Sequence, residues 1–279
     1  MILIDYSAIS FAAVLAQQKY IEDFNVDILR HIILNSILSF KKKFSDEYGE
    51  LVLCMDGPNS WRKDIFPYYK ANRKKMKEDN SEFWDDLHTT INVITSEFKT
   101  EIPFKMIKVD RAEGDDVIAV LAQKYPGPHI IISNDKDFIQ LLSIPDLKIY
   151  APVKKTFINH QHPDMFLKEQ IIRGDNGDGI PNVFSDDDTF VNPDKRQKPI
   201  FSKNLKNWLN APFSSFVDVP DNLERNNKCI NFKEIPSSLE EKIVEEFTAP
   251  WEKPKANEMY NYFVKHRMKN MIEDIQSFY

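Results

Sequence analysis

We expect this chain to adopt an α/β fold, with a mostly parallel, doubly wound sheet and a smaller helical region towards its C-terminal end. Short apolar runs of strand length alternate with amphipathic segments of helical period through the first part of the sequence. From about residue 163 the strand-like runs give way to a helical and loop-rich pattern. Alternation of this kind places helices on both faces of one sheet.

The expected elements follow one another in order. The strands are apolar runs at residues 1–4, 51–55, 104–109 and 129–133. Runs with so few polar residues are typical of strands that are buried on both faces of a parallel sheet. The helices, which have an apolar face, are expected at residues 28–43, 83–98 and 113–125.

Composition sets the broad class of the protein. With 279 residues, 42% hydrophobic and 12% aromatic, the chain can bury a substantial core and is not generally disordered. Its first residues lack a basic leader and include Asp5 within the apolar run, which excludes a secretory signal and a membrane span there. Cys54 and Cys229 form neither a disulfide framework nor a zinc pattern. We expect a soluble, cytoplasmic monomer that does not bind membranes.

Acidic residues follow three of the expected strands at the point where each strand ends. They are Asp5, Asp56, and the pair Asp135 and Asp137. The carboxyl ends of parallel strands meet at one edge of a sheet, where open α/β folds bind ligands. Carboxylates crowded at that edge repel one another and lose solvation, so bound Mg²⁺ or Mn²⁺ would stabilise them.

Two further acidic clusters are candidates for the same site. They are Glu113, Asp115 and Asp116 at the start of an expected helix, and Asp175 and Asp178 in a Gly-Asp-Asn-Gly-Asp run. Acids also cap helix N-termini, so capping is an alternative for one member of the first cluster. A simple Gly-Asp turn is the alternative for the second cluster.

The candidate carboxylates also explain the charge of the chain. The formal net charge is −6, and without these nine acids the rest of the chain carries +3. An acidic pI therefore does not exclude nucleic acid as a partner, because the acids are concentrated in one proposed site that cations would neutralise.

A basic and aromatic segment, residues 61–77, lies shortly after Asp56. Its candidate nucleic-acid contacts are Arg62, Lys63, Tyr69, Lys70, Arg73, Lys74, Lys75 and Lys77. Cations follow the phosphates of a single strand and rings stack on its bases. A solvated basic face is the ordinary alternative, but the position beside an acidic site favours nucleic-acid binding.

Six motifs in one order resemble those of the flap endonuclease and 5′-to-3′ exonuclease family, including its bacteriophage members with ribonuclease H activity. The motifs are Ile4-Asp5, Met55-Asp56-Gly57, Tyr69-Lys70-Ala71-Asn72-Arg73, Glu113-Gly114-Asp115-Asp116, Ser133-Asn134-Asp135-Lys136-Asp137 and Gly174-Asp175-Asn176-Gly177-Asp178. The likeness runs along the whole chain. Any one of these motifs is weak evidence, whereas all six in order are specific.

The resemblance implies a Mg²⁺-dependent 5′-to-3′ exonuclease and flap endonuclease that removes RNA primers from RNA-DNA hybrids and trims 5′ DNA ends during phage DNA replication. It implies two Mg²⁺ ions, for which Mn²⁺ can substitute, and Lys70 and Arg73 at the scissile phosphate. The implied ligands of the first ion are Asp5, Asp56, Glu113, Asp115 and Asp135, with Asp116 beside them, and those of the second are Asp137, Asp175 and Asp178.

The resemblance also implies an arrangement of domains and a set of partners. Residues 1–160 would form the α/β metal-binding nuclease domain, with an arch at 57–80, and residues 161–279 a helical DNA-binding region with a helix-turn-helix near 171–210. The implied partners are RNA-DNA hybrid and branched or nicked duplex DNA, with a single-strand-binding protein or sliding clamp as assistants. A phage-encoded chain would act in the host cytoplasm.

Other functions are compatible with parts of this pattern. A Toprim-type or PIN-type nuclease also combines strand-end acids with Asp-x-Asp, but it lacks the basic aromatic segment and the Gly-Asp run. A phosphatase with an aspartyl nucleophile would have a second Asp where Ser7 lies. A catalytically silent, structure-specific DNA-binding protein would be expected to lose some of its costly clustered acids.

Overall fold

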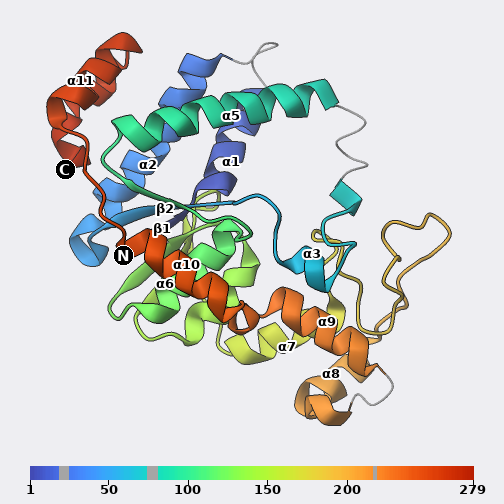
Figure 1. The fold of residues 1–279 in the computed structure, drawn as a ribbon. Coiled ribbons are helices and arrows are strands. Elements are labelled where there is room, and N and C mark those ends of the chain that lie inside the picture. The colour runs from blue at the N-terminus through green and yellow to red at the C-terminus, as the bar shows by residue number, and fades with distance from the viewer. Residues whose placement is uncertain (19–24, 74–80, 216–218) are drawn as a thin grey trace.

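The computed structural model of the chain describes residues 1–18, 25–73, 81–215 and 219–279, built around one sheet of six strands. The strand order is β3-β2-β1-β4-β5-β6 (Figure 1). The strands are β1 (Ile2–Asp5), β2 (Leu51–Met55), β3 (Lys105–Lys108), β4 (His129–Ile132), β5 (Leu147–Ala151) and β6 (Thr156–Ile158). Strands β1 to β5 run parallel, and β6 joins β5 antiparallel. The predicted α/β fold class is confirmed.

Burial explains why the apolar runs become strands. Every residue of β1, β2 and β4 is buried, so these strands have helices against both faces. Strand β1 lies between β2 and β4, with Ile4 opposite Leu53 on one side and Ile132 on the other. The acids at the ends of these three strands therefore emerge at one edge of the sheet.

Helices cover both faces of the sheet, as Figure 1 shows. One face carries α1 (Tyr6–Gln18), α2 (Val26–Tyr48), α5 (Ser81–Glu101), α11 (Ala256–Lys265), α12 (Lys269–Glu273) and the 3₁₀ helix η4 (Ile275–Phe278). The other carries α6 (Gly114–Lys124), η1 (Lys136–Ser143), η3 (Phe232–Glu234) and α10 (Ser237–Thr248). The last helices of the chain thus pack on the α/β core, where Phe263 and Phe278 are fully buried.

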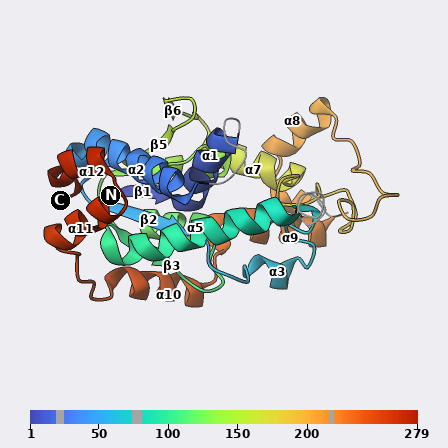
Figure 2. The same cartoon turned by 90° about the horizontal axis from the view of Figure 1, so that it is seen from above.

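A smaller helical group lies at one end of the molecule, away from both termini (Figure 2). It consists of α3 (Arg62–Ile65), α7 (Pro163–Arg173), α8 (Ser202–Asn210), η2 (Phe213–Ser215) and α9 (Pro220–Ile230). Its apolar contacts join Phe66 and Tyr69 to Ile171 and Ile230. The region near 171–210, where the resemblance implies a helix-turn-helix, contains the end of α7, the long segment 174–201 and α8.

Some elements were not predicted. Helix α1 begins directly after Asp5, with no loop between it and β1, and its Ala-rich and Phe-containing sequence hides the helical period. Strands β5 and β6 form a hairpin at the sheet edge, where Phe157 is half-exposed and the apolar run is less complete. Of the helices within the described residues, none combines the length and the apolar character that a membrane crossing requires.

Candidate active site

The carboxylates of Asp5, Asp56 and Asp135 lie at the ends of three adjacent strands. The Asp5 oxygens accept hydrogen bonds from the Ala8 backbone N–H at 3.0 Å and from the Ser133 hydroxyl at 2.9 Å. Asp56 Oδ1 accepts from the Gly114 N–H at 2.8 Å, at the N-terminus of α6. These contacts fix the carboxylates of β1 and β2 beside the start of the helix that carries Asp115.

At Gly57 the loop after β2 passes very close to the backbone of Val109 and Ala112. Its N–H donates to the Ala112 carbonyl at 2.7 Å, and a Cβ at this position would lie 1.9 Å from the Val109 carbonyl oxygen. A side chain larger than hydrogen would therefore displace the loop that carries Asp56 away from the start of α6.

Burial, with added repulsion between the acids, raises the pKa values of this group. Burial, with the neighbouring charges of Asp56 and Asp135, raises the pKa of Asp5 to about 6. Burial, followed by Asp5 and Asp135, raises the pKa of Asp115 well above its ordinary value. Burial and nearby acids likewise raise the pKa of Asp135. The four carboxylates thus lie within electrostatic reach of one another. Among the described residues, Lys70 and Lys136 lower the pKa values of Asp115 and Asp135 but do not outweigh the effect of burial.

A second acidic group continues from the first. Burial raises the pKa of Asp137 to about 7, with added repulsion from Asp135 and Asp175. Asp175 Oδ1 accepts from the backbone N–H groups of Gly177 at 2.7 Å and Asp178 at 3.1 Å, which closes a tight loop after α7. Gly174 has φ +69° at the start of this loop, a conformation that suits glycine.

The donor atoms of both groups suit a hard divalent cation. They are carboxylate oxygens, which Mg²⁺ and Mn²⁺ prefer. Within the described ranges, however, no three His, Cys, Asp or Glu side chains lie close enough to enclose a metal ion. Several of the oxygens are turned to backbone N–H groups, so these side chains would have to rotate towards a common point to hold one.

Asp116 has a different environment from the other acids. Its carboxylate is fully buried and accepts from Arg62 at 2.7 and 3.0 Å, from the Trp61 indole at 3.1 Å and from the Glu113 N–H at 2.9 Å. Both oxygens are occupied by the protein. These contacts fit the capping alternative for Asp116 and add an ion pair, while its predicted metal contact stays a prediction.

Arg62 is the partner that neutralises Asp116. Its side chain is 3% exposed, and besides Asp116 it contacts Glu113 at 3.1 Å and the Cys229 carbonyl of α9 at 2.7 Å. Arg62 thus joins α3, α6 and α9, and the nucleic-acid contact predicted for it stays a prediction.

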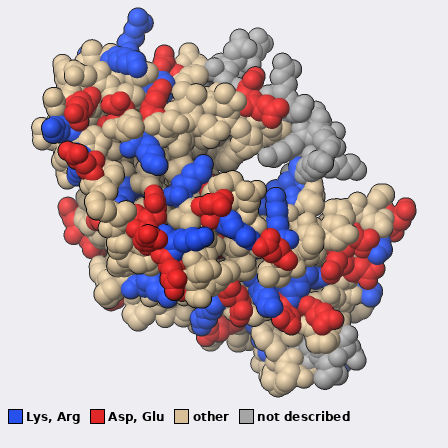
Figure 3. Space-filling model, viewed as in Figure 1, with Lys and Arg blue, Asp and Glu red and all other residues tan. Residues whose placement is uncertain are grey.

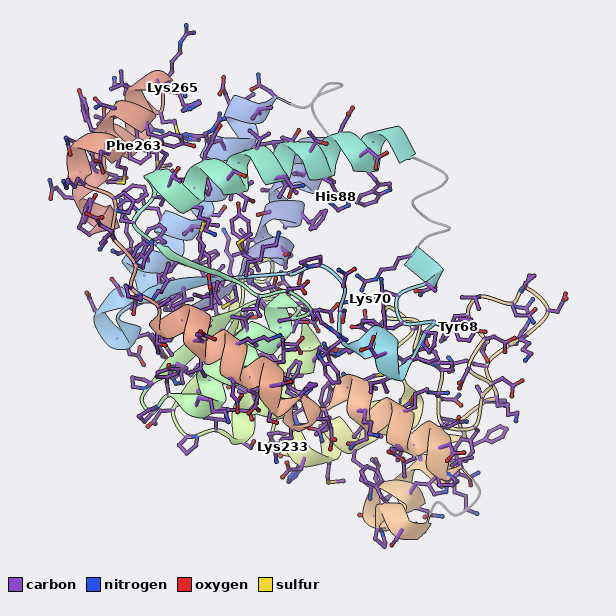
Figure 4. The ribbon with its side chains drawn as sticks, viewed as in Figure 1. Tyr68, Lys70, His88, Lys233, Phe263 and Lys265 are labelled. Carbon is purple, nitrogen blue, oxygen red and sulfur yellow. The ribbon has the colours of Figure 1, made fainter. Side chains whose placement is uncertain are left out.

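Tyr69, Lys70 and Arg73 reach the acidic site from the segment after α3. The Tyr69 hydroxyl lies 2.7 Å from Glu113 Oε2 and 2.8 Å from Asp178 Oδ2, so its one proton links the two carboxylates. Lys70 Nζ donates to Glu113 Oε1 at 2.6 Å, and Arg73 donates to Asp178 Oδ1 at 2.6 Å. Figure 4 labels Lys70, which lies next to α3.

Neighbouring cations lower the pKa of Glu113. Burial would raise the pKa of this carboxyl, but the charges of Lys70 and Arg62 outweigh it and hold the pKa below its ordinary value. Lys70 also has a left-handed backbone with φ 57°, and its N–H donates to the Asp178 carbonyl at 2.7 Å. Such conformations are strained for a residue with a side chain, and the hydrogen bond helps to hold this one.

The remaining predicted cations are less informative. Lys63 is exposed on α3. Lys74, Lys75 and Lys77 lie outside the described residues. Basic and acidic side chains are intermixed over the described part of the face in Figure 3.

Other contacts of the site were not predicted. Ser133 holds Asp5, Trp61 holds Asp116, and the Gln170 amide of α7 donates to Asp137. Ser133 belongs to the motif around Asp135, so the sequence could have indicated it as a site residue. Gln170 and Trp61 carried no such signal, because their partners are remote in sequence.

Comparison with known proteins identifies the family. Residues 1–170 match the N-terminal, resolvase-like domain of 5′-3′ exonucleases, and residues 161–278 match the C-terminal domain of T4 RNase H. The chain belongs to the 5′-3′ exonuclease family. Nuclease activity is therefore its general function, and the acidic edge described above is its candidate centre.

Two curated relatives illustrate the range of this family. The ribonuclease H of Enterobacteria phage T4 is 29% identical over 99% of this chain and 95% of its own length. A 5′-3′ exonuclease of Buchnera aphidicola is 28% identical over 82% of this chain and 72% of its own length.

Solved structures of the phage T5 enzyme share the fold. A T5 5′-exonuclease with bound divalent zinc has a TM-score of 0.58 at 17% identity, covering 88% of this chain and 97% of its own. The T5 D15 flap endonuclease in a complex with DNA and metal ions has a TM-score of 0.58 at 15% identity, covering 99% and 98%. At this identity the likeness concerns the fold alone.

Proposed function

We propose that this protein is a divalent-metal-dependent 5′-to-3′ nuclease that hydrolyses phosphodiester bonds in RNA-DNA hybrids and at 5′ DNA flaps, and that it removes RNA primers during replication. The observation that carries the proposal is the group of carboxylates whose pKa values are raised by burial and by one another, next to Tyr69, Lys70 and Arg73. Family membership and the names of the relatives support the substrate class.

Two Mg²⁺ ions, or Mn²⁺ in their place, would be held by these acids. The proposed ligands of the first are Asp5, Asp56, Glu113, Asp115 and Asp135, and those of the second are Asp137, Asp175 and Asp178. Bound divalent ions activate a water molecule and stabilise the charge that develops on the phosphate. Hydrogen bonds to backbone N–H groups hold Asp5 and Asp56 at the ends of β1 and β2, and their carboxylates would rotate from there towards a bound ion.

Lys70 and Arg73 would bind and orient the scissile phosphate. Both cations are now paired with carboxylates proposed as ligands, Glu113 and Asp178. A positive ion at those carboxylates would weaken the pairs, because the negative charge that holds each cation would be shared. The released cations would then lie next to the site at which a phosphate arrives. Arg62 keeps Asp116 and is not released.

A product-length assay tests this function. A 5′-labelled RNA-DNA hybrid, a 5′ flap and a blunt duplex are incubated with the protein, with and without Mg²⁺. We expect short products from the 5′ end of the hybrid and the flap, and no products without a divalent ion. Binding of flap DNA without cleavage under any metal condition would instead favour a silent DNA-binding protein.

A further inference from the structure

A cavity of about 420 Å³ lies between α1, α2 and the β5–β6 hairpin, outside the acidic site. Small side chains make it hollow: Ala8, Ala12 and Ala13 of α1 form one wall. Helix α2 contributes Phe40 and Lys43 on the opposite side. The volume falls in the range of pockets that bind small organic ligands.

The cavity adjoins the proposed active site directly. Ser133 and Ala8 line it, and these two residues hold the two oxygens of Asp5, at 2.9 Å from the Ser133 hydroxyl and 3.0 Å from the Ala8 N–H. Asn134, which precedes Asp135, lines it as well. A molecule in this cavity is therefore separated from the strand-end carboxylates by a single layer of residues.

The cavity and Lys70 lie on opposite sides of the strand-end carboxylates. The cavity lies on the sheet face covered by α1 and α2, whereas Lys70 contacts Glu113 at the start of α6 on the opposite face. The carboxylates lie between the two. A strand that passes from Lys70 across the carboxylates thus arrives at the cavity.

The lining combines aromatic surface with positive charge. Phe40 and Tyr150 supply rings, and Lys43 and Lys155 supply two cations, while the cavity lining contains no acidic residue among those the structure describes. Lys43 Nζ lies 3.9 Å from the centre of the Tyr150 ring. Neither lysine forms an ion pair with the described part of the chain, so both are available to an anion.

Rings and cations in one hollow match a ligand that has a flat apolar part and an anionic part. A nucleotide has both, and a strand of nucleic acid presents one next to every phosphate. The acidic site would repel such an anion until metal is bound, whereas the cavity attracts it through Lys43 and Lys155.

We propose that this cavity is a nucleotide subsite, which takes the base of the nucleotide beside the scissile phosphate on the side away from Lys70. The base packs against Phe40 and the small wall of α1, and Lys43 and Lys155 pair with its phosphate. This proposal rests on the proposed nuclease function, since it names how that site holds its strand.

The test measures binding of a single nucleotide without any reaction. The probe is 2-aminopurine deoxyribonucleoside 5′-monophosphate, whose fluorescence changes on stacking, titrated into the full chain in EDTA. We expect millimolar binding by the wild type. Ala12→Phe fills the hollow at an exposed helix position and should weaken binding at least about tenfold, because the ring would occupy the space of the base.

Two further variants test the proposal even if the Ala12→Phe protein does not fold. Lys43 and Lys155 are exposed, and the double change Lys43→Gln and Lys155→Gln should weaken binding roughly five- to tenfold by removing charge-assisted contacts. Ala256→Phe adds the same ring at an exposed position on α11 and should leave binding unchanged. Thermal unfolding verifies that each variant is folded.

Binding that survives both the filled cavity and the loss of the two lysines would overturn the subsite, as would the absence of any binding by the wild type at millimolar nucleotide. The outcome is separable from that of the nuclease proposal, because this measurement needs neither metal nor cleavage. A wild type that binds the probe but cuts nothing would refute the nuclease and overturn the place of the subsite beside a scissile phosphate, leaving a nucleotide-binding cavity.

Discussion

Asp115 and Asp116 are neighbours in the chain but differ in how their charge is balanced. Asp116 is fully buried against Arg62 and the Trp61 indole, which use both of its oxygens. Asp115 faces Asp5 and Asp135, and its pKa is raised by burial and by these two like charges. A buried acid with its own cation is part of the framework, whereas an acid surrounded by acids requires a cation from outside.

The same contrast divides the whole edge of the sheet. On the α3 side, Lys70 and Arg73 pair with Glu113 and Asp178, and the pKa of Glu113 is lowered. Around the ends of β1 and β4, Asp5 and Asp137 have raised pKa values of about 6 and 7. The unbalanced acids are proposed as metal ligands alone, whereas Glu113 and Asp178 are proposed ligands that also hold the two cations meant for the phosphate.

The largest expected effect is on the unbalanced acids. Asp135→Asn should reduce cleavage of a 5′-labelled RNA-DNA hybrid by about 10³-fold, the scale of losing one group that stabilises the transition state electrostatically. Affinity for the hybrid should change little. Asp146→Asn is the matched control, since Asp146 is exposed before β5 and Asn tolerates its φ of 58°. Retained turnover by the Asp135 variant would contradict its role as a ligand.

A substitution at Asp116, the acid with its own cation, should lower the free energy of unfolding. Asp116→Asn leaves the buried Arg62 guanidinium without its full counter-charge, and breaking a buried pair in this way costs about 3–5 kcal/mol of unfolding free energy. Asp115→Asn removes a repelled charge and should stabilise the metal-free protein instead. Urea unfolding in EDTA measures both. Equal losses of stability in the two variants would remove the distinction between these neighbours.

The cations after α3 sharpen the comparison. Changing both Lys70 and Arg73 to Gln should lower the single-turnover cleavage rate about 10- to 100-fold and lower duplex affinity less, because the proposed contact is with the reacting phosphate. Lys99→Gln, at an exposed position in the last turn of α5, serves as the control for general charge loss. If rate and affinity fall equally in the double variant, these cations are ordinary phosphate contacts.

The strand-end acids could be found from sequence because strands and their ends are local features. An apolar run such as residues 51–55 marks a buried strand, and the next acid must then lie at the sheet edge. The pairing of Arg62 with Asp116 could not be found this way. The two residues are far apart in the chain, and whether a cation reaches an acid is decided by how α3 packs on α6.

The missed elements have similar causes. Helix α1 has few polar residues to reveal its exposed face, and the hairpin of β5 and β6 lies at an edge where one strand is only partly buried. The cavity beside Asp5 depends on both elements, so no sequence pattern indicated it. The carboxylates, but not the surfaces around them, were thus predictable.

The smallest expected effect is on the pH dependence of stability without metal. In the folded chain Asp5 and Asp137 hold protons up to about pH 6 and 7, whereas ordinary Asp side chains release theirs near pH 4. Stability should therefore fall as pH rises through this window, because the folded state binds more protons there than the unfolded state. Burial lowers the pKa of His129, which makes stability rise with pH instead, so the wild type must be compared with a variant that keeps His129.

The melting temperature of Asp137→Asn minus that of the wild type, measured by calorimetry in EDTA, should increase by a few degrees from about pH 5 to 8. Saturating Mg²⁺ should abolish this increase by stabilising the wild type. A difference that stays flat with pH in EDTA would mean that Asp137 is already neutralised within the protein, on the same terms as Asp116.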